Sequence, residues 1–418
     1  MTYTYDDIRL TFTAEPGGDS VQVTAIDLAT GRHATGQFVQ PLAPDELALD
    51  GVRAGGSRNA GPPPGAHHEP QRAEDIGRRL ADALFTGDVG ALFDRALDRV
   101  EEHRDRGLRL SLSLGRAPAL LDMPWEFLYV RPLFLASQRR TPVVRVIEND
   151  RPVEPVTVDG ALRVLGVVSS PAGLAPLDVA AERADVETAT ATMRESGRLQ
   201  LDWLDAATPA QLRRALGAGV VHVLHFVGHS DLTAGGGVIY LTDDDGGAVA
   251  VDEVLLANIV ADASPSLGLV VLNSCKSGRS TPEDPQAGVA ATLMSLGLPA
   301  VVGMQRAISD RAAITFAGEL YAGLIDRREP IDVSVSEARK AIYADGSSDE
   351  WATPVLFVRD PAVPLFSFAA ADDPPQPTTT APVITVTGSG PVAIGGNVTI
   401  TGGTVAGRDV VDPDTRRR

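Results

Sequence analysis

Cysteine is almost absent from this chain: Cys275 is the only one among 418 residues. A single thiol excludes an internal disulfide and argues against a thiolate zinc site. A lone cysteine is usually a small buried hydrophobe. Cys275, however, lies in the polar segment Asn273-Ser-Cys-Lys-Ser-Gly278, directly after an apolar run. Because this setting favours exposure and a nearby positive charge, we interpret Cys275 as a functional residue.

The chain also lacks long apolar runs and an excess of basic charge. No run approaches the roughly 20 apolar residues that span a bilayer. The start, Met1-Thr-Tyr-Thr-Tyr-Asp-Asp7, has neither the basic segment nor the apolar core of a secretion signal. We therefore expect a cytoplasmic protein without a membrane partner. The formal net charge of −18 argues against a nucleic-acid partner, since such binders need a basic surface.

Several catalytic templates are missing as well. Gly228-His-Ser-Asp-Leu232 lacks the final glycine of a serine nucleophile elbow. There is no P-loop, no His-Glu-x-x-His and no Gly-x-Gly-x-x-Gly after a strand. The pair His67-His68 has no other metal ligands in view, and the run Asp243–Asp245 with its following glycines predicts a hairpin turn. We expect no metal and no cofactor.

What is present is an alternation of short β-rich apolar runs with helical patterns. Thr208-Pro209 predicts a capped helix start with proline in the first turn, and Ser309 predicts the cap of a long helix. Strands separated by helices predict a doubly wound α/β domain with right-handed crossovers. Strands are expected at 162–169, 199–204, 221–229, 267–275, 299–303 and 354–358, and helices at 179–195, 209–218, 253–261, 287–296, 310–327 and 333–344.

The first third of the chain predicts other structures. Residues 3–40 alternate and carry turn residues, which predicts a small antiparallel β elaboration. Residues 73–104 have a helical pattern that Gly87 and Gly90 are expected to break into two helices. The strict alternation of 108–114 predicts a half-buried strand. Just beyond it, we expect Trp125 to be a packed aromatic and Glu126 a buried, hydrogen-bonded acid.

The last 50 residues differ in composition. Residues 369–382 form a proline-rich linker, which we expect to be extended and semi-rigid. Residues 383–418 are short β-branched pieces separated by glycine, and they are too few to build a core of their own. They form either a disordered terminus, a hairpin docked on the body, or a self-templating β segment. The sequence leaves these alternatives open.

Two of the apolar runs end in a reactive side chain, His229 and Cys275. In an open parallel sheet the functional crevice lies beyond the carboxyl ends of the strands, so these two residues are expected to face each other there. A neighbouring imidazole can supply the base that a thiol needs to attack an acyl carbon. The backbone amides of Ser230 and Cys275 are candidate oxyanion donors. We interpret His225, on the same strand, as a core histidine.

At these residues the sequence resembles the CHAT family of caspase-like peptidases, which is related to caspases and separases. The resemblance covers about residues 75–366. It implies a caspase-like α/β/α sandwich with a mostly parallel central sheet, and a peptidase dyad of His229 as base and Cys275 as nucleophile. It rests on the segments 225–229, 271–278, 298–305, 308–310, 337–339, 351–357 and 123–127 and on Phe316 and Tyr321.

Three positions bear on specificity or activity. Caspase relatives usually have glycine directly after the catalytic histidine, where this chain has Ser230, and a side chain there would restrict the backbone at the oxyanion site. Gln305 and Asp310 are candidate substrate-binding residues. Asp310 either selects a basic side chain or complements the dipole of the helix that it starts.

The tail resembles the glycine-punctuated, amyloid-like signalling motifs that bacteria attach to effector domains. That resemblance implies recruitment by an upstream sensor, or self-association, through residues 383–418. We predict four parts: an N-terminal β and helical elaboration (1–106), a peptidase domain (107–368), the linker (369–382) and the tail (383–418). The predicted function is a cysteine endopeptidase that cleaves proteins as an effector of bacterial signalling or defence. An inactive, partner-binding scaffold is the main alternative, and an acyltransferase or esterase is a third.

Overall fold

The computed structural model describes residues 3–14, 20–43, 46, 69–147, 152–205, 207–233, 236–261, 263, 265–274, 288–306, 308–346 and 349–369. Cys275, the pair His67-His68, the linker beyond residue 369 and the whole tail lie outside these residues. By their contacts, residues divide into two units, Met1–Ala371 and Asp372–Arg418. The description that follows concerns the first unit.

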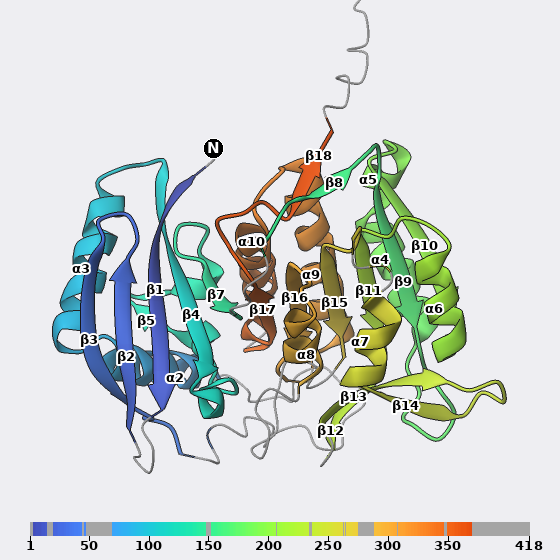
Figure 1. Cartoon of the computed structure of the whole chain (residues 1–418), viewed down its shortest axis with the longest axis horizontal. Helices are drawn as coiled ribbons and strands as arrows, with labels where there is room; N and C mark the ends of the chain where they lie inside the picture. The colour runs from blue at the N-terminus through green and yellow to red at the C-terminus, as the bar shows by residue number, and fades with distance from the viewer. Residues whose placement is uncertain are drawn as a thin grey trace, which may run out of the picture. The chain divides into compact units, whose positions relative to one another are not determined.

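An eleven-stranded sheet forms the centre of this unit (Figure 1). Its strand order is β10-β9-β11-β15-β16-β17-β7-β4-β1-β2-β3. The strands are β1 (Thr4–Ala14), β2 (Ser20–Asp27), β3 (Arg32–Val39), β4 (Arg106–Arg116), β7 (Val143–Val146), β9 (Leu162–Val168), β10 (Leu199–Asp205), β11 (Val223–Val227), β15 (Leu269–Asn273), β16 (Ala300–Met304) and β17 (Pro354–Val358). Smaller sheets hold β5 (Tyr129–Val130), β6 (Leu133–Phe134), β8 (Val156–Val158), β12 (Ser230–Thr233), β13 (Gly236–Thr242), β14 (Ala248–Asp252) and β18 (Phe366–Phe368).

Most neighbouring strands of the large sheet are parallel. The antiparallel pairs are β16 with β17, β1 with β2, and β2 with β3. From β10 through β16 all neighbours are parallel. β9, β11, β15 and β16 are apolar and largely buried, as expected for strands covered on both faces, whereas β10, at the edge, is partly exposed. The predicted mixed α/β class with a large, mostly parallel central sheet is therefore confirmed.

Helices cover both faces of the sheet from β9 to β16 and one face of the strands β1–β3 (Figure 1). The chain moves outward from β9 to β10 and then back across β9 to β11, β15 and β16. With right-handed crossovers, this reversal puts α4 and α5 on one face and α6, α7 and α8 on the other. The helices are α2 (Glu69–Leu84), α3 (Gly87–Glu101), α4 (Val179–Ala189), α5 (Ala191–Glu195), α6 (Pro209–Gly217), α7 (Glu253–Ala261), α8 (Val289–Ser295), α9 (Asp310–Tyr321) and α10 (Ile331–Ala344). Short 3-10 turns are η1 (Pro118–Leu120), η2 (Trp125–Phe127), η3 (Leu135–Ser137) and η5 (Glu350–Ala352), and η4 (Ala322–Asp326) is a π-helical turn after α9.

Local sequence signals explain several element boundaries. Thr208 caps α6 and Pro209 lies in its first turn, as predicted. In addition, Thr208 and Gln211 form a capping box. The hairpin predicted at Asp243–Gly247 joins β13 to β14. The helical pattern at 73–104 does split into two helices, with α3 beginning at Gly87. Gly90 lies inside α3, where a Cβ would stand 2.4 Å from the carbonyl oxygen of Phe85.

The prediction of a half-buried strand at 108–114 is wrong. β4 is buried along almost its whole length, polar positions included. Arg109 is 4% exposed because α10 lies over that face, and its Nε donates to Asp332 Oδ2 at 2.5 Å. A buried ion pair thus replaces the solvent that the alternating pattern predicted.

The N-terminal strands are antiparallel to one another, as predicted. In addition, β1 pairs in parallel with β4, from Thr4↔Arg106 to Thr13↔Arg116. The sheet therefore continues across residue 106 without a break, and the division of the chain at that residue stays a prediction.

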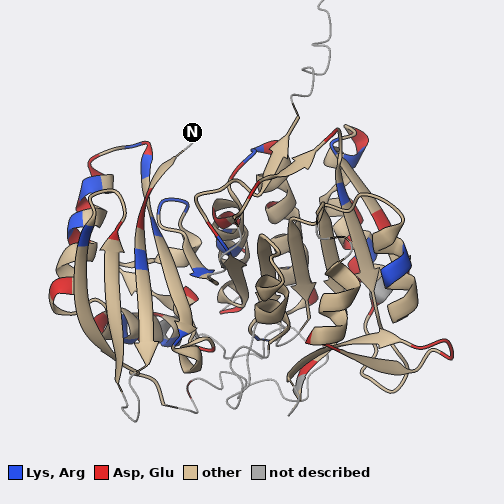
Figure 2. Cartoon of the chain, in the orientation of Figure 1, with Lys and Arg blue, Asp and Glu red and all other residues tan. Residues whose placement is uncertain are grey.

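Charged residues of both signs are interspersed along the described elements (Figure 2). Many arginines lie against acids of neighbouring elements, as Arg131 does with Asp98 and Glu101 of α3. Among the residues that the structure describes, no helix is long and apolar enough to cross a membrane.

Candidate functional site

The site is built where two adjacent parallel strands end. β11 and β15 pair in register from Val223↔Leu269 to Val227↔Asn273. His229 follows Val227 by two residues, and in the sequence Cys275 follows Asn273 by two residues. Cys275 itself lies outside the described residues. The register nevertheless places the strand end that bears the histidine next to the strand end that leads to the cysteine.

Glycine at position 228 lets the chain turn out of β11 toward His229. A Cβ there would stand 2.5 Å from the ring of Phe226 and 3.1 Å from the carbonyl oxygen of Ser169. Phe226 is buried, so its ring can move aside only by displacing the side chains around it. The segment Gly228-His229 therefore owes its glycine to close packing just before the functional side chain.

His229 is held at both its ring and its backbone. Its Nε2 lies 2.7 Å from the carbonyl oxygen of Ala175, and its own carbonyl accepts the N–H of Tyr240, on β13, at 2.9 Å. A carbonyl only accepts, so Nε2 carries the proton of this hydrogen bond. In the neutral imidazole, Nδ1 is then the nitrogen that can take up a proton. No sequence pattern could point to Ala175, because a backbone carbonyl can come from any residue type.

Ser230 does not strain the backbone after the histidine. It begins β12 and pairs with Ile239. Among the described residues other than glycine, a positive φ occurs only at Arg131, Pro132 and Arg328. The chain at position 230 therefore adopts a conformation open to any residue, and a glycine is not required there.

The other two histidines near this strand lie in the core. His225 is 2% exposed, its Nδ1 lies 2.9 Å from the Tyr321 hydroxyl, and burial lowers its pKa to about 4. His222 is also buried; its Nδ1 accepts the N–H of Arg163 at 2.9 Å, and burial together with the charge of Arg163 lowers its pKa. Both are neutral at pH 7, which agrees with the interpretation of His225 as a core residue.

Asp310 is the first residue of α9, directly after its cap. Ser309 Oγ accepts the N–H of Ala312 at 3.3 Å, as the sequence predicted for a cap at this position. Asp310 also lines a hollow of about 460 Å³ between α4 and α9. Acidic side chains dominate its wall: Asp178, Glu182, Asp185 and Asp310, together with Ala181, Arg311, Ile314 and Thr315. The α4 wall starts at Asp178, three residues after the Ala175 carbonyl that holds His229.

Gln305, the second candidate for substrate binding, is only 4% exposed. Its Oε1 lies 3.4 Å from Arg145 Nη2, and its Nε2 lies 3.5 Å from the carbonyl oxygens of Leu121 and Met123. The side chain thus lies against a network inside the protein, not in the acidic hollow. A role for Gln305 in substrate binding stays a prediction.

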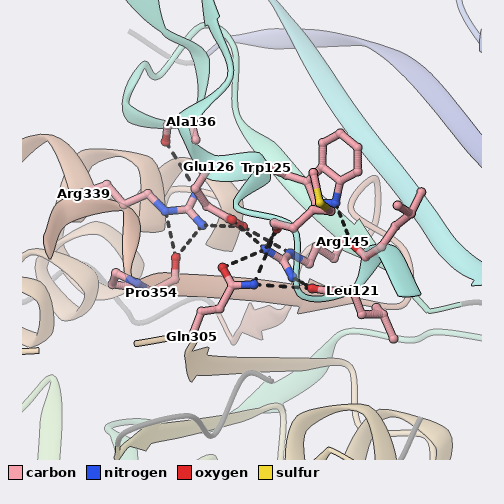
Figure 3. A network of polar contacts seen from close by, with 10 residues as sticks. Leu121, Trp125, Glu126, Ala136, Arg145, Gln305, Arg339 and Pro354 are labelled. Atoms are coloured by element: carbon pink, nitrogen blue, oxygen red, sulfur yellow. Dashed lines mark hydrogen bonds and ion pairs between the residues drawn. The ribbon is translucent and has the colours of Figure 1, made fainter. Parts of the chain in front are cut away.

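That network is centred on Glu126 (Figure 3). Its carboxylate lies 2.6 Å from Arg145 Nη2 and 3.6 Å from Arg339 Nη2, and all three side chains are fully buried. Arg145 also donates to the carbonyls of Leu121 and Met123, and Arg339 to that of Pro354. The buried, hydrogen-bonded acid predicted at Glu126 is confirmed.

The network has one more cation than it has anions. Burial lowers the pKa of Arg339 to about 10, with repulsion from Arg145 in the same direction and attraction by Glu126 opposing both. The Glu126 network joins β7, α10 and the start of β17, which lie far apart in the sequence. Sequence reasoning missed Arg145 because it sits in a short strand of otherwise apolar residues, and nothing local marks its partner.

This chain is similar to a known protein family and to solved structures. The CHAT domain model matches residues 74–374. No curated protein matches the chain. Two crystal structures of the Saccharomyces cerevisiae separase-securin complex are similar to this chain. One has 12% sequence identity and a TM-score of 0.44 over 87% of this chain, and the other has 11% identity and a TM-score of 0.47 over 85%. In each case the match covers 30% of the other chain, so this chain spans less than a third of it.

Proposed function

This chain belongs to the CHAT domain family, and on that premise we propose that it is a caspase-like cysteine endopeptidase with Cys275 as nucleophile and His229 as base. The observation that carries the proposal is the in-register pairing of β11 with β15, each of which ends two residues before one member of the dyad. The function of the family and the positions in the sequence support the same assignment of roles.

The hydrogen bond at Nε2 sets the direction of proton transfer. With that nitrogen donating to Ala175, Nδ1 of His229 accepts the proton of the Cys275 thiol as the sulfur attacks the scissile carbonyl. The carbonyl of Ala175 also stabilises the imidazolium that forms. The same Nδ1–H then protonates the leaving amine, and water hydrolyses the thioester with His229 again as base.

The developing oxyanion needs donors that are in place before the reaction. The backbone N–H groups of Ser230 and Cys275 are our candidates, as the two amides nearest the strand ends. The backbone at Ser230 has an ordinary φ, so the serine in place of the family's usual glycine is no argument for an inactive protein. The ordinary backbone at Ser230 supports the peptidase proposal over the scaffold alternative.

We further propose that the substrate has a basic residue before the cut. Asp310 lies in a hollow with three further carboxylates, at the side of the loop that holds His229. A guanidinium or ammonium group placed there gains from several negative charges at once. A protein substrate, a cytoplasmic location and a role as a bacterial signalling effector recruited through 383–418 belong to the same proposal.

A cleavage assay tests the proposed function. The purified chain is incubated with a peptide mixture derived from a host proteome, with and without forced clustering through residues 383–418. Cys275→Ala serves as the control, and we expect it to remove all cleavage while leaving the folded protein intact. Cleavage by Cys275→Ala equal to that of the unchanged chain would overturn the proposal.

A further inference from the structure

The amino end of α9 is held by a carboxylate from a distant part of the chain. Glu350, which begins η5, accepts the N–H of Ser309 through Oε1 at 2.9 Å and its hydroxyl through Oε2 at 2.8 Å. With its proton committed to Glu350, the Ser309 oxygen turns a lone pair to the N–H of Ala312. A residue 41 positions away in the sequence thus holds both the backbone N–H and the hydroxyl of the residue that caps α9.

The loop before α9 has a second set of contacts with the residues around Glu350. The Arg306 guanidinium donates to the Asp349 carboxylate at 2.6 Å and to the Asp349 carbonyl at 2.9 Å. It also lies 5.1 Å from the ring centre of Phe127. The N–H of Gln305 donates to the carbonyl of Thr353 at 3.0 Å. The segment that runs from β16 into α9 is therefore fastened to the residues just before β17.

Asp310 directly follows the residue that Glu350 holds. Its carboxylate and that of Glu350 are both near the positive end of the helix dipole, but only Asp310 lines the acidic hollow. A displacement of about 1 Å in a group that positions a substrate can cost on the order of 100-fold in rate. Whether Asp310 can meet a substrate cation therefore depends on how firmly the first turn of α9 is held.

We propose that Glu350 is a positioning residue for substrate selection: it fixes Ser309, and through it places the Asp310 carboxylate that receives the basic side chain. Glu350 itself does not touch the substrate. The inference rests on the proposed function, because it assigns a role within the same site. It differs from simple helix capping in that Glu350 must affect the choice of substrate and not only the stability of α9.

The experiment compares variants of the chain on four peptides that differ only in the residue before the cut: Arg, Lys, Leu or Asp. Glu350→Gln replaces an acceptor oxygen by an amide that donates to the Ser309 hydroxyl and so competes with its cap. Ser309→Ala removes the link, and Asp310→Asn removes the charge that is being positioned. Glu319→Gln, at the other end of α9, makes the same charge change and is the matched control.

We expect Glu350→Gln to lower the Arg-to-Leu ratio of kcat/KM about tenfold, through KM for the basic peptides. For Glu350→Gln, kcat/KM for the Leu peptide should change less than twofold. For the control Glu319→Gln, the Arg-to-Leu ratio should change less than twofold. In an Asp310→Asn background, Glu350→Gln should have no further effect on the ratio, since the two act as a unit. Rescue of the ratio by Glu350→Asp would support the role of the carboxylate.

Three results would overturn the inference. An unchanged Arg-to-Leu ratio in Glu350→Gln removes the role of Glu350, and so does an equal loss on all four peptides. A wild-type chain that cleaves all four peptides alike removes the role of Asp310 as well. If the wild-type chain cleaves none of them, the proposed function fails separately, and amide hydrogen exchange of residues 309–313 decides the positioning claim. Exchange that is unchanged by Glu350→Gln refutes it, and faster exchange limited to this turn supports it.

Discussion

His225 and Tyr321 face each other in the core beside the candidate site, with Nδ1 2.9 Å from the phenol oxygen. The histidine comes from β11 and the tyrosine from α9, so this contact joins the strand that leads to His229 to the helix that starts at Asp310. Burial raises the pKa of Tyr321 and lowers that of His225 to about 4. Both side chains are therefore neutral across the physiological range.

The His225 pair predicts acid sensitivity. The folded state holds His225 at a pKa of about 4 against the usual 6.5, so it binds fewer protons than the unfolded state between these values. The contribution of neutral His225 to the free energy of unfolding is complete above pH 6.5, and about 3 kcal/mol of it is lost as the pH drops toward 4. His225→Gln, which keeps a hydrogen-bonding group but does not titrate, should flatten most of this loss in urea unfolding curves measured from pH 4 to 7.

His222, whose pKa is also lowered, should account for a residual slope. His103→Gln, at an exposed position, is the control and should leave the profile as it is. A profile of His225→Gln that matches the wild-type chain would contradict the prediction.

The Glu126 network predicts a large loss of stability. Glu126→Gln leaves Arg145 and Arg339 buried without the charge that compensates them. Removing one partner of a buried ion pair typically costs about 3–5 kcal/mol, whereas an exposed pair is worth less than about 1 kcal/mol. Glu101→Gln, which breaks an exposed contact with Arg131, is the matched control. Equal urea midpoints for the two variants would show that the network contributes little.

Gly228 predicts a packing defect at the site. Gly228→Ala would place a methyl group against the buried ring of Phe226, and overpacking of this kind costs about 1–3 kcal/mol. Because position 228 directly precedes His229, we also expect the substitution to shift His229 and to cause a large drop in Cys275-dependent cleavage. Gly217→Ala, at the end of α6, has no atom within 4 Å of the added methyl and should leave both properties unchanged. Full activity of Gly228→Ala would show that His229 tolerates movement of its strand end.

The dyad predicts the reactivity of the single thiol. If His229 supplies the base or the counter-charge, Cys275 should react with iodoacetamide at pH 7 faster than a free cysteine, whose pKa is about 8.5. His229→Ala should slow this alkylation about tenfold or more, while His103→Ala should not. Alkylation that is equally slow in the wild-type chain and both variants would favour the scaffold hypothesis.

Local signals predicted much of the scaffold because their causes are local. The capping box at Thr208, the cap at Ser309 and the turn at Asp243 each depend on residues only a few positions apart. The buried strand ends before His229 and Cys275 were likewise readable from apolar runs. These elements needed no knowledge of what packs on them.

Long-range partners could not be predicted in the same way. The alternating sequence of β4 predicts one solvent-exposed face. Only the position of α10 shows that Arg109 instead forms an ion pair with Asp332 on that face. The contacts of Ser309 with Glu350, and of Arg145 with Glu126, join segments that no periodicity connects. For the candidate site, sequence patterns predicted His229 and the cap at Ser309, but not the Ala175 carbonyl or the Glu350 carboxylate that contact them.

The position of β17 in the sheet has a consequence for biosynthesis. β17 pairs with β16 on one side and with β7 on the other, so it joins the two halves of the sheet. A nascent chain that has not yet released Pro354–Val358 from the ribosome lacks the strand that joins β16 to β7. Glu350 and Trp351 come just before this strand, so the hold on the first turn of α9 is completed in the same late step. The end of α9 that we propose to select the substrate thus gains its contact with Glu350 only after most of the body has been synthesised.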